Sequence, residues 1–281
     1  MGKKNAWSKK GRARGYSRGA PRWRSRGNPK VTGVLPVGLE KSAKVMPYVV
    51  HSVKEYVCVM ELHDEVNNEE LKRVIEMFKG RIYQRPPVRS NVKRRIRIRK
   101  IHDIELLERK GNHVLMRIKC DAGTYMRKLC HDIGLLLGVG AHMRELRRTV
   151  SGPFTEDHAV RMQELSEAIY LWKNYGNDSA LRKMILPVEL STCILPKILV
   201  KDSAISSLLY GAPLAKGGVA AYSEDLQTNK IAAVFTSKIE LIGIYEILNN
   251  PKKNKNGKVV GRPLAVIMER NSYPKNWGKK I

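Results

Sequence analysis

The residues whose types and spacing most directly suggest chemistry are the arginines of residues 93–100, a stretch that reads KRRIRIRK. In a strand, the alternation from Arg95 to Arg99 would place guanidinium groups on one face and isoleucines on the other. A planar guanidinium binds two phosphate oxygens, and such contacts position a nucleic acid without selecting its sequence. We therefore predict a phosphate-binding surface, with a solvated charged face as the alternative. Its predicted members are Lys30, Arg81, Arg89, Lys93, Arg94, Arg95, Arg97, Arg147 and Arg148.

The charge of the whole chain favours the same kind of partner. Of its 281 residues, 53 are Lys or Arg and 26 are Asp or Glu, which gives a formal net charge of +27. This excess attracts polyanions, and nucleic acid is the leading candidate because neutralised phosphates release counterions. A generic basic protein associated with the ribosome is the alternative. The hydrophobic fraction of 42% is sufficient for a packed core in two modest domains or one large one.

Several classes of protein are excluded by what the sequence lacks. It has no apolar run long enough to span a bilayer, and its basic N-terminus is not followed by the apolar run of a secretory signal. The four cysteines form no CxxC pair and have no histidine cluster beside them, which argues against a zinc site or a disulfide framework. We expect a cytoplasmic protein with reduced, mostly buried thiols, no metal and no cofactor.

Hydrophobic periodicity predicts the elements that position these residues. Strands are predicted over residues 54–62, 113–120 and 143–150, with extended structure over 81–107. Helices are predicted over residues 31–45, 69–78 and 123–137; Asn67 and Asn68 cap the second of them, and Gly80 follows its end. Further helices are predicted over 162–175 and 180–185. Pro187 and Pro196 then bracket a linker to a small β-rich domain over residues 197–275.

Residues 1–27 differ from everything that follows. They contain ten Lys or Arg residues and no acidic residue, interleaved with Trp7, Tyr16 and Trp23. Such a segment buries too little apolar surface to fold alone. We interpret it as an RNA-binding arm or as a non-native leader.

Several motifs, taken in order and spacing, resemble one known family. They are PKVTGVLPVGLE at 29–40, GRIYQRPPVRSNVK at 80–93, GTYMRKLCHDIGLLL at 123–137, GAHMRELRR at 140–148, GAPLAKGGV at 211–219 and YPKNW at 273–277. Together they resemble the RNA pseudouridine synthases of the tRNA pseudouridine synthase B and dyskerin type. The resemblance implies an α+β catalytic domain over residues 29–190 with a mixed or mainly antiparallel sheet. It also implies a small β-rich PUA domain over 195–278, whose RNA-binding residues include Gly211 and Lys216.

The resemblance also implies a reaction. Such enzymes detach uracil from its ribose, rotate it and rejoin it through carbon, after flipping the nucleotide out of its stack. Family members use one aspartate in a pattern similar to Gly-Thr-Leu-Asp-Pro-Lys-Val-Thr-Gly. Here Asn28 occupies the aspartate position, and the match is complete only from Pro29 onward. Because an amide is a far poorer nucleophile than a carboxylate, we predict a chain that is inactive or nearly so as written.

Four further positions match the family's active site. Tyr56 corresponds to the tyrosine that stacks on the flipped base, and Tyr125 to a second aromatic residue. Arg127 corresponds to the arginine that pairs with the catalytic aspartate. Leu146 corresponds to an apolar wall of the base pocket. The alternatives are a half-buried strand tyrosine, a surface arginine and an ordinary core leucine.

The family usually has several dozen residues before the aspartate motif, including a strand of the catalytic sheet. None of these is recognisable in residues 1–28, so we expect a catalytic domain truncated or replaced at its N-terminus. The sharp edge of the resemblance beside Asn28 suggests a gene-model start within an intron or a fused exon. Sequencing the messenger RNA would test this hypothesis.

Three functions compete. The first is the catalytic subunit of an RNA-guided H/ACA particle that acts on rRNA or tRNA, with a guide RNA, a small zinc-ribbon-like protein, a glycine/arginine-rich protein and a kink-turn-binding protein as implied partners. The second is a catalytically dead RNA-binding paralogue that acts through its PUA domain. The third, a generic ribosome-associated protein, does not explain the motifs together.

Overall fold

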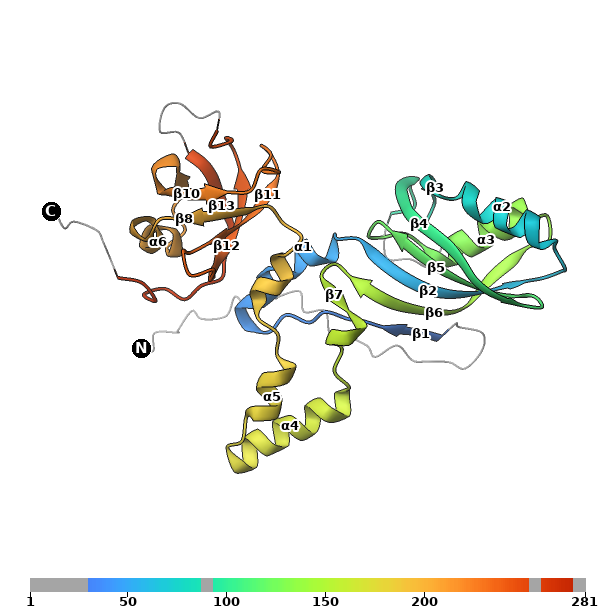
Figure 1. The fold of residues 1–281 in the computed structure, drawn as a ribbon, viewed down its shortest axis with the longest axis horizontal. Coiled ribbons are helices and arrows are strands. Elements are labelled where there is room, and N and C mark those ends of the chain that lie inside the picture. Colours follow the sequence, from blue (N-terminus) through green and yellow to red (C-terminus); the bar gives the residue numbers. More distant parts are fainter. Residues whose placement is uncertain (1–29, 87–92, 253–258, 275–281) are drawn as a thin grey trace, which may run out of the picture.

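A computed structural model describes residues 30–86, 93–252 and 259–274, which form two units built on separate β-sheets (Figure 1). The first sheet has seven strands in the order β1-β6-β2-β5-β4-β3, with β7 paired to β6. Only β1 and β6 run parallel, so the sheet is mixed and mainly antiparallel, as predicted. The strands are β1 (Lys30–Gly33), β2 (Lys54–Leu62), β3 (Gly80–Gln84), β4 (Arg97–Lys110), β5 (His113–Cys120), β6 (Ala141–Ser151) and β7 (Phe154–Thr155).

Two helices cover one face of this sheet, α2 (Asn68–Met77) and α3 (Met126–Leu136) (Figure 1). Helix α2 begins where the sequence predicts, because the Asn67 side chain accepts a hydrogen bond from the Glu69 amide at 2.8 Å. Strand β2 alternates as predicted, and its inward side chains pack against both helices. The core contains Cys58, Met60, Leu62, Leu71, Ile75, Ile118, Leu129 and Ile133.

The predicted helix over residues 31–45 is wrong. Residues 30–33 form β1, which pairs with β6 in parallel, and only two short turns follow, η1 (Glu40–Lys44) and α1 (Met46–Val50). Gly33 has φ +108° and a Cβ there would lie 2.2 Å from the Arg148 carbonyl oxygen, so this position requires the chain to pass close to β6. The pairing of β1 with β6, which is distant in sequence, therefore determines the local structure, although the spacing of the apolar residues suits a helix.

The second unit contains a six-stranded sheet in the order β10-β8-β11-β12-β13-β9. Its elements are β8 (Lys197–Val200), α6 (Asp202–Leu209), β9 (Leu214–Ala215), η4 (Lys216–Gly218), β10 (Val219–Tyr222), β11 (Ile231–Phe235), β12 (Leu241–Ile247) and β13 (Val259–Val266). Helix α6 was not predicted, but the β-rich character was. The core of this second unit includes the buried side chains of Ile198, Leu208, Val234 and Tyr245.

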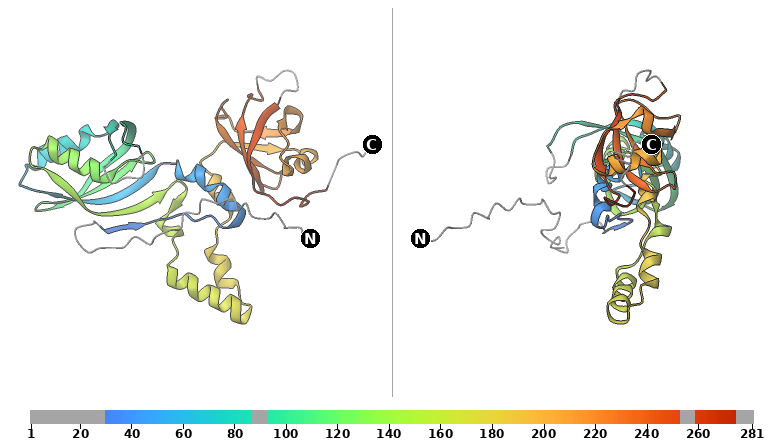
Figure 2. Two further views of the ribbon diagram at one scale, coloured as in Figure 1. Left: turned by 180° about the vertical axis from the view of Figure 1, so that it is seen from behind. Right: turned by 90° about the vertical axis from the view of Figure 1, so that its left-hand side faces the viewer.

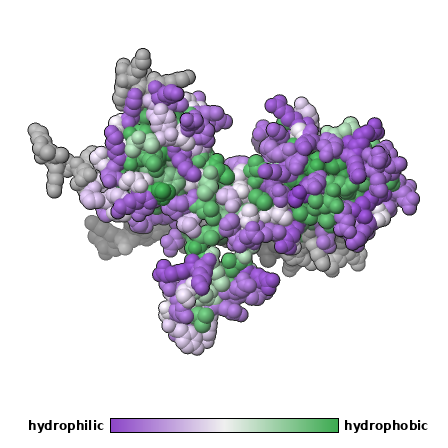
Figure 3. Space-filling model, in the orientation of Figure 1, coloured by the Kyte–Doolittle hydropathy of each residue, from purple (hydrophilic) through white to green (hydrophobic). Residues whose placement is uncertain are grey.

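The chain between the two sheets forms a projection and a joint. Helices α4 (Met162–Tyr175) and α5 (Ser179–Met184) project from the body in every view (Figures 1 and 2). The short helices η2 (Glu156–His158) and η3 (Val188–Thr192) flank this projection. Val45, between η1 and α1, is buried in one cluster with Phe235 and Leu241 of the second sheet. This segment therefore joins the two units. The visible surface is largely hydrophilic, with apolar patches over the first sheet and near this joint (Figure 3).

Candidate active site

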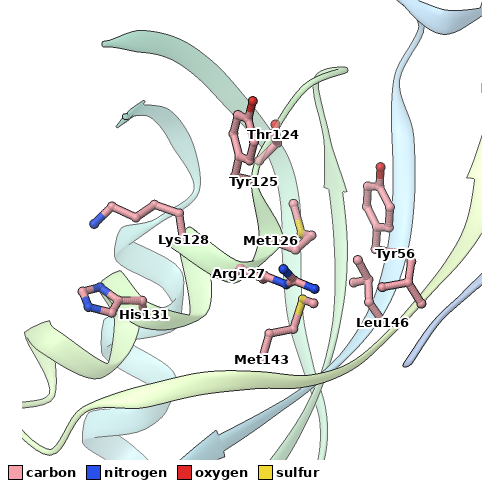
Figure 4. Close-up of a pocket in the computed structure, with 10 residues that line it drawn as sticks. Tyr56, Thr124, Tyr125, Met126, Arg127, Lys128, His131, Met143 and Leu146 are labelled. Carbon is pink, nitrogen blue, oxygen red and sulfur yellow. The ribbon is translucent and has the colours of Figure 1, made fainter. Parts of the chain in front are cut away.

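A cavity of about 510 Å³ opens between α3 and the strands β1, β2 and β6 (Figure 4). It brings together four of the five residues predicted for catalysis. The fifth, Asn28, lies outside the described residues, two positions before the start of β1. The lining residues are Val31, Tyr56, Thr124, Tyr125, Met126, Arg127, Lys128, His131, Met143 and Leu146.

The sheet register places Tyr56 and Leu146 as diagonal neighbours on β2 and β6. Leu146 of β6 lies opposite Val31 of β1 and opposite Cys58 of β2. Two residues further along β6, Arg148 lies opposite Tyr56 of β2. Tyr56 therefore offers an aromatic face beside an aliphatic wall, an arrangement suited to holding an unstacked base. Burial raises the pKa of the Tyr56 phenol, and the positive charge of Arg148 opposes that rise.

Tyr125 and Arg127 stand at the start of α3, where Tyr125 is the N-cap residue. The buried side chain of Gln84 holds this point from β3. Its Oε1 accepts from the Tyr125 amide at 2.9 Å, and its Nε2 donates to the Tyr125 carbonyl oxygen at 3.2 Å. From there the Arg127 side chain extends across the cavity toward Tyr56 and Leu146, between Met126 and Met143 (Figure 4). Gln84 was missed as a positioning residue, although it lies within the motif at 80–93.

The described lining of the cavity is cationic and contains no carboxylate. Arg127 is exposed and forms no ion pair within the described ranges. Lys128 is neutralised by Asp132 on the next turn of α3, and His131 Nδ1 lies 3.5 Å from the same carboxylate. The predicted pairing of Arg127 with a carboxylate therefore finds no partner among these lining residues and stays a prediction. In residues 30–86, 93–252 and 259–274, no group of three His, Cys, Asp or Glu side chains could hold a metal ion.

The predicted alternation of arginine and isoleucine exists, with the arginines on the less exposed face, and a phosphate contact for Arg97 stays a prediction. Arg97 and Arg99 are partly buried, and a Cβ at Gly123 would lie 3.3 Å from the Arg99 guanidinium. Ile96 and Ile98 are the exposed side chains, at 67% and 52%. The reason is the register of β4, whose next inward residue after Arg99 is the fully buried Ile101.

The other predicted phosphate contacts divide into three groups. Arg81, Lys93, Arg94 and Arg95 are exposed, as a phosphate surface requires. Arg147 is exposed but ion-paired with Glu156, whereas Arg148 is half-buried and hydrogen-bonded within the sheet. Arg89 lies outside the described residues, and Lys30 is described only as the first residue of β1.

A second cavity, of about 400 Å³, lies where η1 meets the second unit. Lys41 is ion-paired with Glu269 beside it, and the Arg270 guanidinium lies 5.5 Å from the centre of the Tyr210 ring. Gly211 lines this cavity with φ +87°, while Lys216 lies in η4 and is not among the lining residues. The RNA-binding role predicted for Gly211 and Lys216 stays a prediction.

Lys54 is a buried cation near the active-site cavity. Its Nζ donates to the Val49 carbonyl oxygen at 2.8 Å and to Ser52 Oγ at 2.9 Å. Burial, and then the positive charge of Arg148, lowers the pKa of Lys54 from 10.5 to about 8. Below pH 8 the folded and unfolded chains both carry this proton, but from pH 8 to 10.5 only the unfolded chain keeps it. The contribution of Lys54 to the free energy of unfolding must therefore rise with pH across that window.

A Lys54→Met variant should lack this rise. Between pH 8 and 9.5 we expect the free energy of unfolding of the unaltered chain to gain roughly 1 kcal/mol per pH unit relative to the variant. Urea denaturation across this range measures the difference. Lys230→Met, at an exposed lysine of the second unit, serves as the control and should keep the slope of the unaltered chain. Equal slopes for the unaltered chain and Lys54→Met would contradict the prediction.

Comparison with known proteins identifies the family of the chain. The family model "TruB family pseudouridylate synthase (N terminal domain)" matches residues 28–126, and "tRNA pseudouridylate synthase B C-terminal domain" matches residues 127–191. A protein of Saccharolobus solfataricus, described as "Probable tRNA pseudouridine synthase B", is 52% identical over 88% of this chain and 99% of its own length. The chain belongs to the TruB family of pseudouridylate synthases.

Other members of the TruB family are also similar. A relative of the same description from Methanocaldococcus jannaschii is 46% identical over 90% of this chain and 76% of its own length. The solved structure "Crystal Structure of a Cbf5-Nop10-Gar1 Complex" superimposes with a TM-score of 0.84 at 43% identity, covering 88% of this chain and 76% of that one. A second, "Structure of H/ACA RNP bound to a substrate RNA containing 2'-deoxyuridine", gives 0.82 at 40% identity, covering 89% and 77%.

These matches confirm the predicted family, the α+β fold class and the enzyme class, an isomerase that makes pseudouridine in RNA. The two TruB family models end at residue 191, before the second sheet. The PUA identity of the second unit therefore stays a prediction. No helix in the described parts of the chain is long and apolar enough to cross a membrane.

Proposed function

We propose that this chain is the RNA-modifying subunit of a guide-RNA particle, in which its fold is built to isomerise uridine to pseudouridine in rRNA or tRNA. The observation that carries the proposal is the cavity where Tyr56, Arg127 and Leu146 meet next to the start of β1. The titles of two similar solved structures support it, because one names an H/ACA particle with substrate RNA and the other a complex with Nop10 and Gar1. We propose partner proteins of the same kind, and a cytoplasmic location remains our prediction.

The described residues suit a flipped uridine. Tyr56 would stack on the base while Leu146 and Met143 exclude water from its other side, since both are apolar and line the same cavity. Arg127 would hold the carboxylate that attacks the nucleoside, by charge-assisted hydrogen bonds. Gln84 would keep Arg127 aimed by fixing the backbone of Tyr125 two residues earlier.

Asn28 alters this proposal for the chain as written. Its amide is neutral and delocalised, so it is a far poorer nucleophile than an aspartate. We propose that the unaltered chain binds RNA and turns over very slowly. The alternative function is then a catalytically dead RNA-binding paralogue, clamping RNA through a PUA-like second unit. The cationic cavity beside Gly211, with Lys44 and Arg270 in its lining, supports such a clamp.

Release of tritium from a tRNA transcript labelled at uridine C5 tests the reaction, because isomerisation frees that hydrogen. The purified chain is assayed alone and with a guide RNA and the partner proteins. Release by the Asn28→Asp variant and not by the unaltered chain would support the enzyme fold and the proposed defect. RNA binding without release by either protein would favour the clamp instead.

Neutralising the exposed cations before β4 should weaken RNA binding mainly at low salt. Replacing Lys93, Arg94 and Arg95 together with glutamine removes up to three phosphate contacts from an exposed segment. We expect the slope of log K against log salt for a tRNA transcript to become shallower by about 2. Filter binding from 50 to 300 mM KCl measures it.

A matched control separates a local contact from net charge. Lys72, Arg73 and Lys79 are also exposed and lie on or beside α2, with Lys79 ion-paired to Asp103. Their triple glutamine variant loses the same charge, and its slope should change by less than half as much. Equal changes of slope in the two triple variants would show that net charge alone, and not a local phosphate surface, determines the salt dependence.

A further inference from the structure

Arg148 lies on the middle one of three adjacent strands, opposite the cavity-lining Tyr56. It lies opposite Gly33 of β1 on one side and opposite Tyr56 of β2 on the other. Its side chain is half-buried, in contrast to the exposed Arg147 beside it. The position therefore links the strand that follows residue 28 to the strand that carries the stacking tyrosine.

The link to β1 uses both the backbone and the side chain of Arg148. The Val34 amide donates to the Arg148 carbonyl oxygen at 2.9 Å, and Arg148 Nε donates back to the Val34 carbonyl oxygen at 2.7 Å. Val34 is thus held at both of its polar backbone groups by one residue. Gly33 allows this approach, since a Cβ there would overlap the Arg148 backbone.

The link to β2 is the register that pairs Arg148 with Tyr56 across the β6–β2 ladder. The positive charge of Arg148 opposes the rise that burial causes in the pKa of the Tyr56 phenol. Arg148 also lies close enough to the buried Lys54 for its charge to destabilise the lysine ammonium. A half-buried guanidinium whose Nε already donates to a backbone carbonyl oxygen is less available to a phosphate than the exposed Lys93 and Arg94.

We propose that Arg148 is a positioning residue that holds the stacking Tyr56 and the strand following position 28 in a fixed relation across the cavity. The inference rests on the proposed function and replaces the phosphate contact predicted for Arg148. A base stacked on Tyr56 reaches the group at position 28 only when β1 and β2 keep this relation. A displacement of about 1 Å in such a geometry costs about 10²-fold in rate.

Kinetics in the Asn28→Asp background test the proposal. Adding Arg148→Gln should lower kcat about 10²-fold while KM changes less than about threefold. Adding Arg148→Lys should recover part of kcat, because an ammonium can still donate to the Val34 carbonyl oxygen. Arg144→Gln is the control on the same strand, where the guanidinium pairs only with Glu61, and it should leave both constants unchanged. A raised KM with an unaltered kcat in Arg148→Gln would return Arg148 to RNA binding and overturn the proposal.

A second measurement does not depend on turnover. In the unaltered chain labelled with 3-fluorotyrosine, the ¹⁹F signal of Tyr56 is identified by its loss in Tyr56→Phe. This signal should shift in Arg148→Gln and in Arg148→Lys, and should not shift in Arg144→Gln. An unmoved signal in both Arg148 variants would overturn the proposal. Absence of pseudouridine with Asn28→Asp would instead refute the proposed function, and the ¹⁹F result would still decide the role of Arg148.

Discussion

The Asn28→Asp variant is expected to form pseudouridine on the order of 10⁴-fold faster than the unaltered chain. The change restores an anionic nucleophile where the chain has a neutral amide of nearly the same shape. A carboxylate at position 28 would meet no negative charge among the lining residues of the cavity, since none of them is acidic. Arg127, which extends into the cavity without an ion pair in the described residues, would be available to bind it. Single-turnover tritium release from a tRNA transcript, with enzyme in excess, measures the rate of the chemical step.

Two control variants separate charge from position. Asn28→Glu carries the same charge as Asn28→Asp on a side chain that is longer by one methylene. We expect it to form pseudouridine at least about 10²-fold more slowly than Asn28→Asp, because a carboxylate displaced by about 1 Å loses about that much in rate. Asn28→Ala should match the unaltered chain. All variants should bind the transcript with Kd values within about threefold of each other, since the exposed cations dominate affinity. An unaltered chain that turns over within tenfold of Asn28→Asp would refute the argument.

Arg127 should matter only when the carboxylate is present. In the unaltered chain, Arg127→Met removes no pairing with an acid, and the already low rate should change little. In the Asn28→Asp background the same substitution removes a charge-assisted hydrogen bond and should cancel much of the gain. The two effects form a double-mutant cycle, and additive effects would show that Arg127 and position 28 do not interact.

The Gly134→Ala variant should lower the free energy of unfolding by about 3 kcal/mol. In a solvent-exposed helix interior the same substitution stabilises by about 1 kcal/mol, so the expected sign is reversed. Gly134 lies within α3, where a Cβ would stand 2.1 Å from the Ala141 backbone nitrogen and 2.4 Å from the Gly140 carbonyl carbon. The Gly134 carbonyl oxygen also accepts from the Gly140 amide at 2.9 Å. The backbone of Gly140 and Ala141 can make room for this Cβ only if α3 moves away from β6.

Urea denaturation followed by circular dichroism measures this change. Gly217→Ala is the matched control, because a Cβ there meets no atom within 4 Å and its backbone is not in the left-handed region. It should shift the free energy of unfolding by less than about 0.5 kcal/mol. A stabilised Gly134→Ala variant would mean that α3 has room to move, and that Arg127 is less firmly placed than the packing indicates.

The parts of the fold that depend on local signals could be predicted from the sequence. The alternation of residues 54–62 marks β2, and the side chain of Asn67 marks the start of α2. The motif at 123–137 marks α3, although the helix begins three residues later, because Tyr125 serves as its cap. These features depend on neighbours along the chain, which the sequence displays directly.

The parts that depend on distant neighbours could not be predicted. The alternation of Arg97 to Arg99 identifies two faces but not which of them faces the core, since Ile101 and the approach of Gly123 decide that. The spacing of residues 31–45 resembles a helix until β6 provides a partner for β1. The motif at 80–93 contains Gln84 but does not indicate that its amide bonds to Tyr125, 41 positions away.

The pairing of β1 with β6 also has a consequence for the order in which the protein matures. Lys30 meets Glu145 in the finished sheet, more than a hundred residues later in the chain. Contacts of such sequence separation carry a large loop-closure cost and form late. A ribosome must therefore synthesise all of β6 before β1 can join it, and the hairpin formed by β4 and β5 can fold long before that point. Strand β6 also carries Leu146, the aliphatic wall beside Tyr56, so the base-binding cavity cannot be completed until β6 has been synthesised.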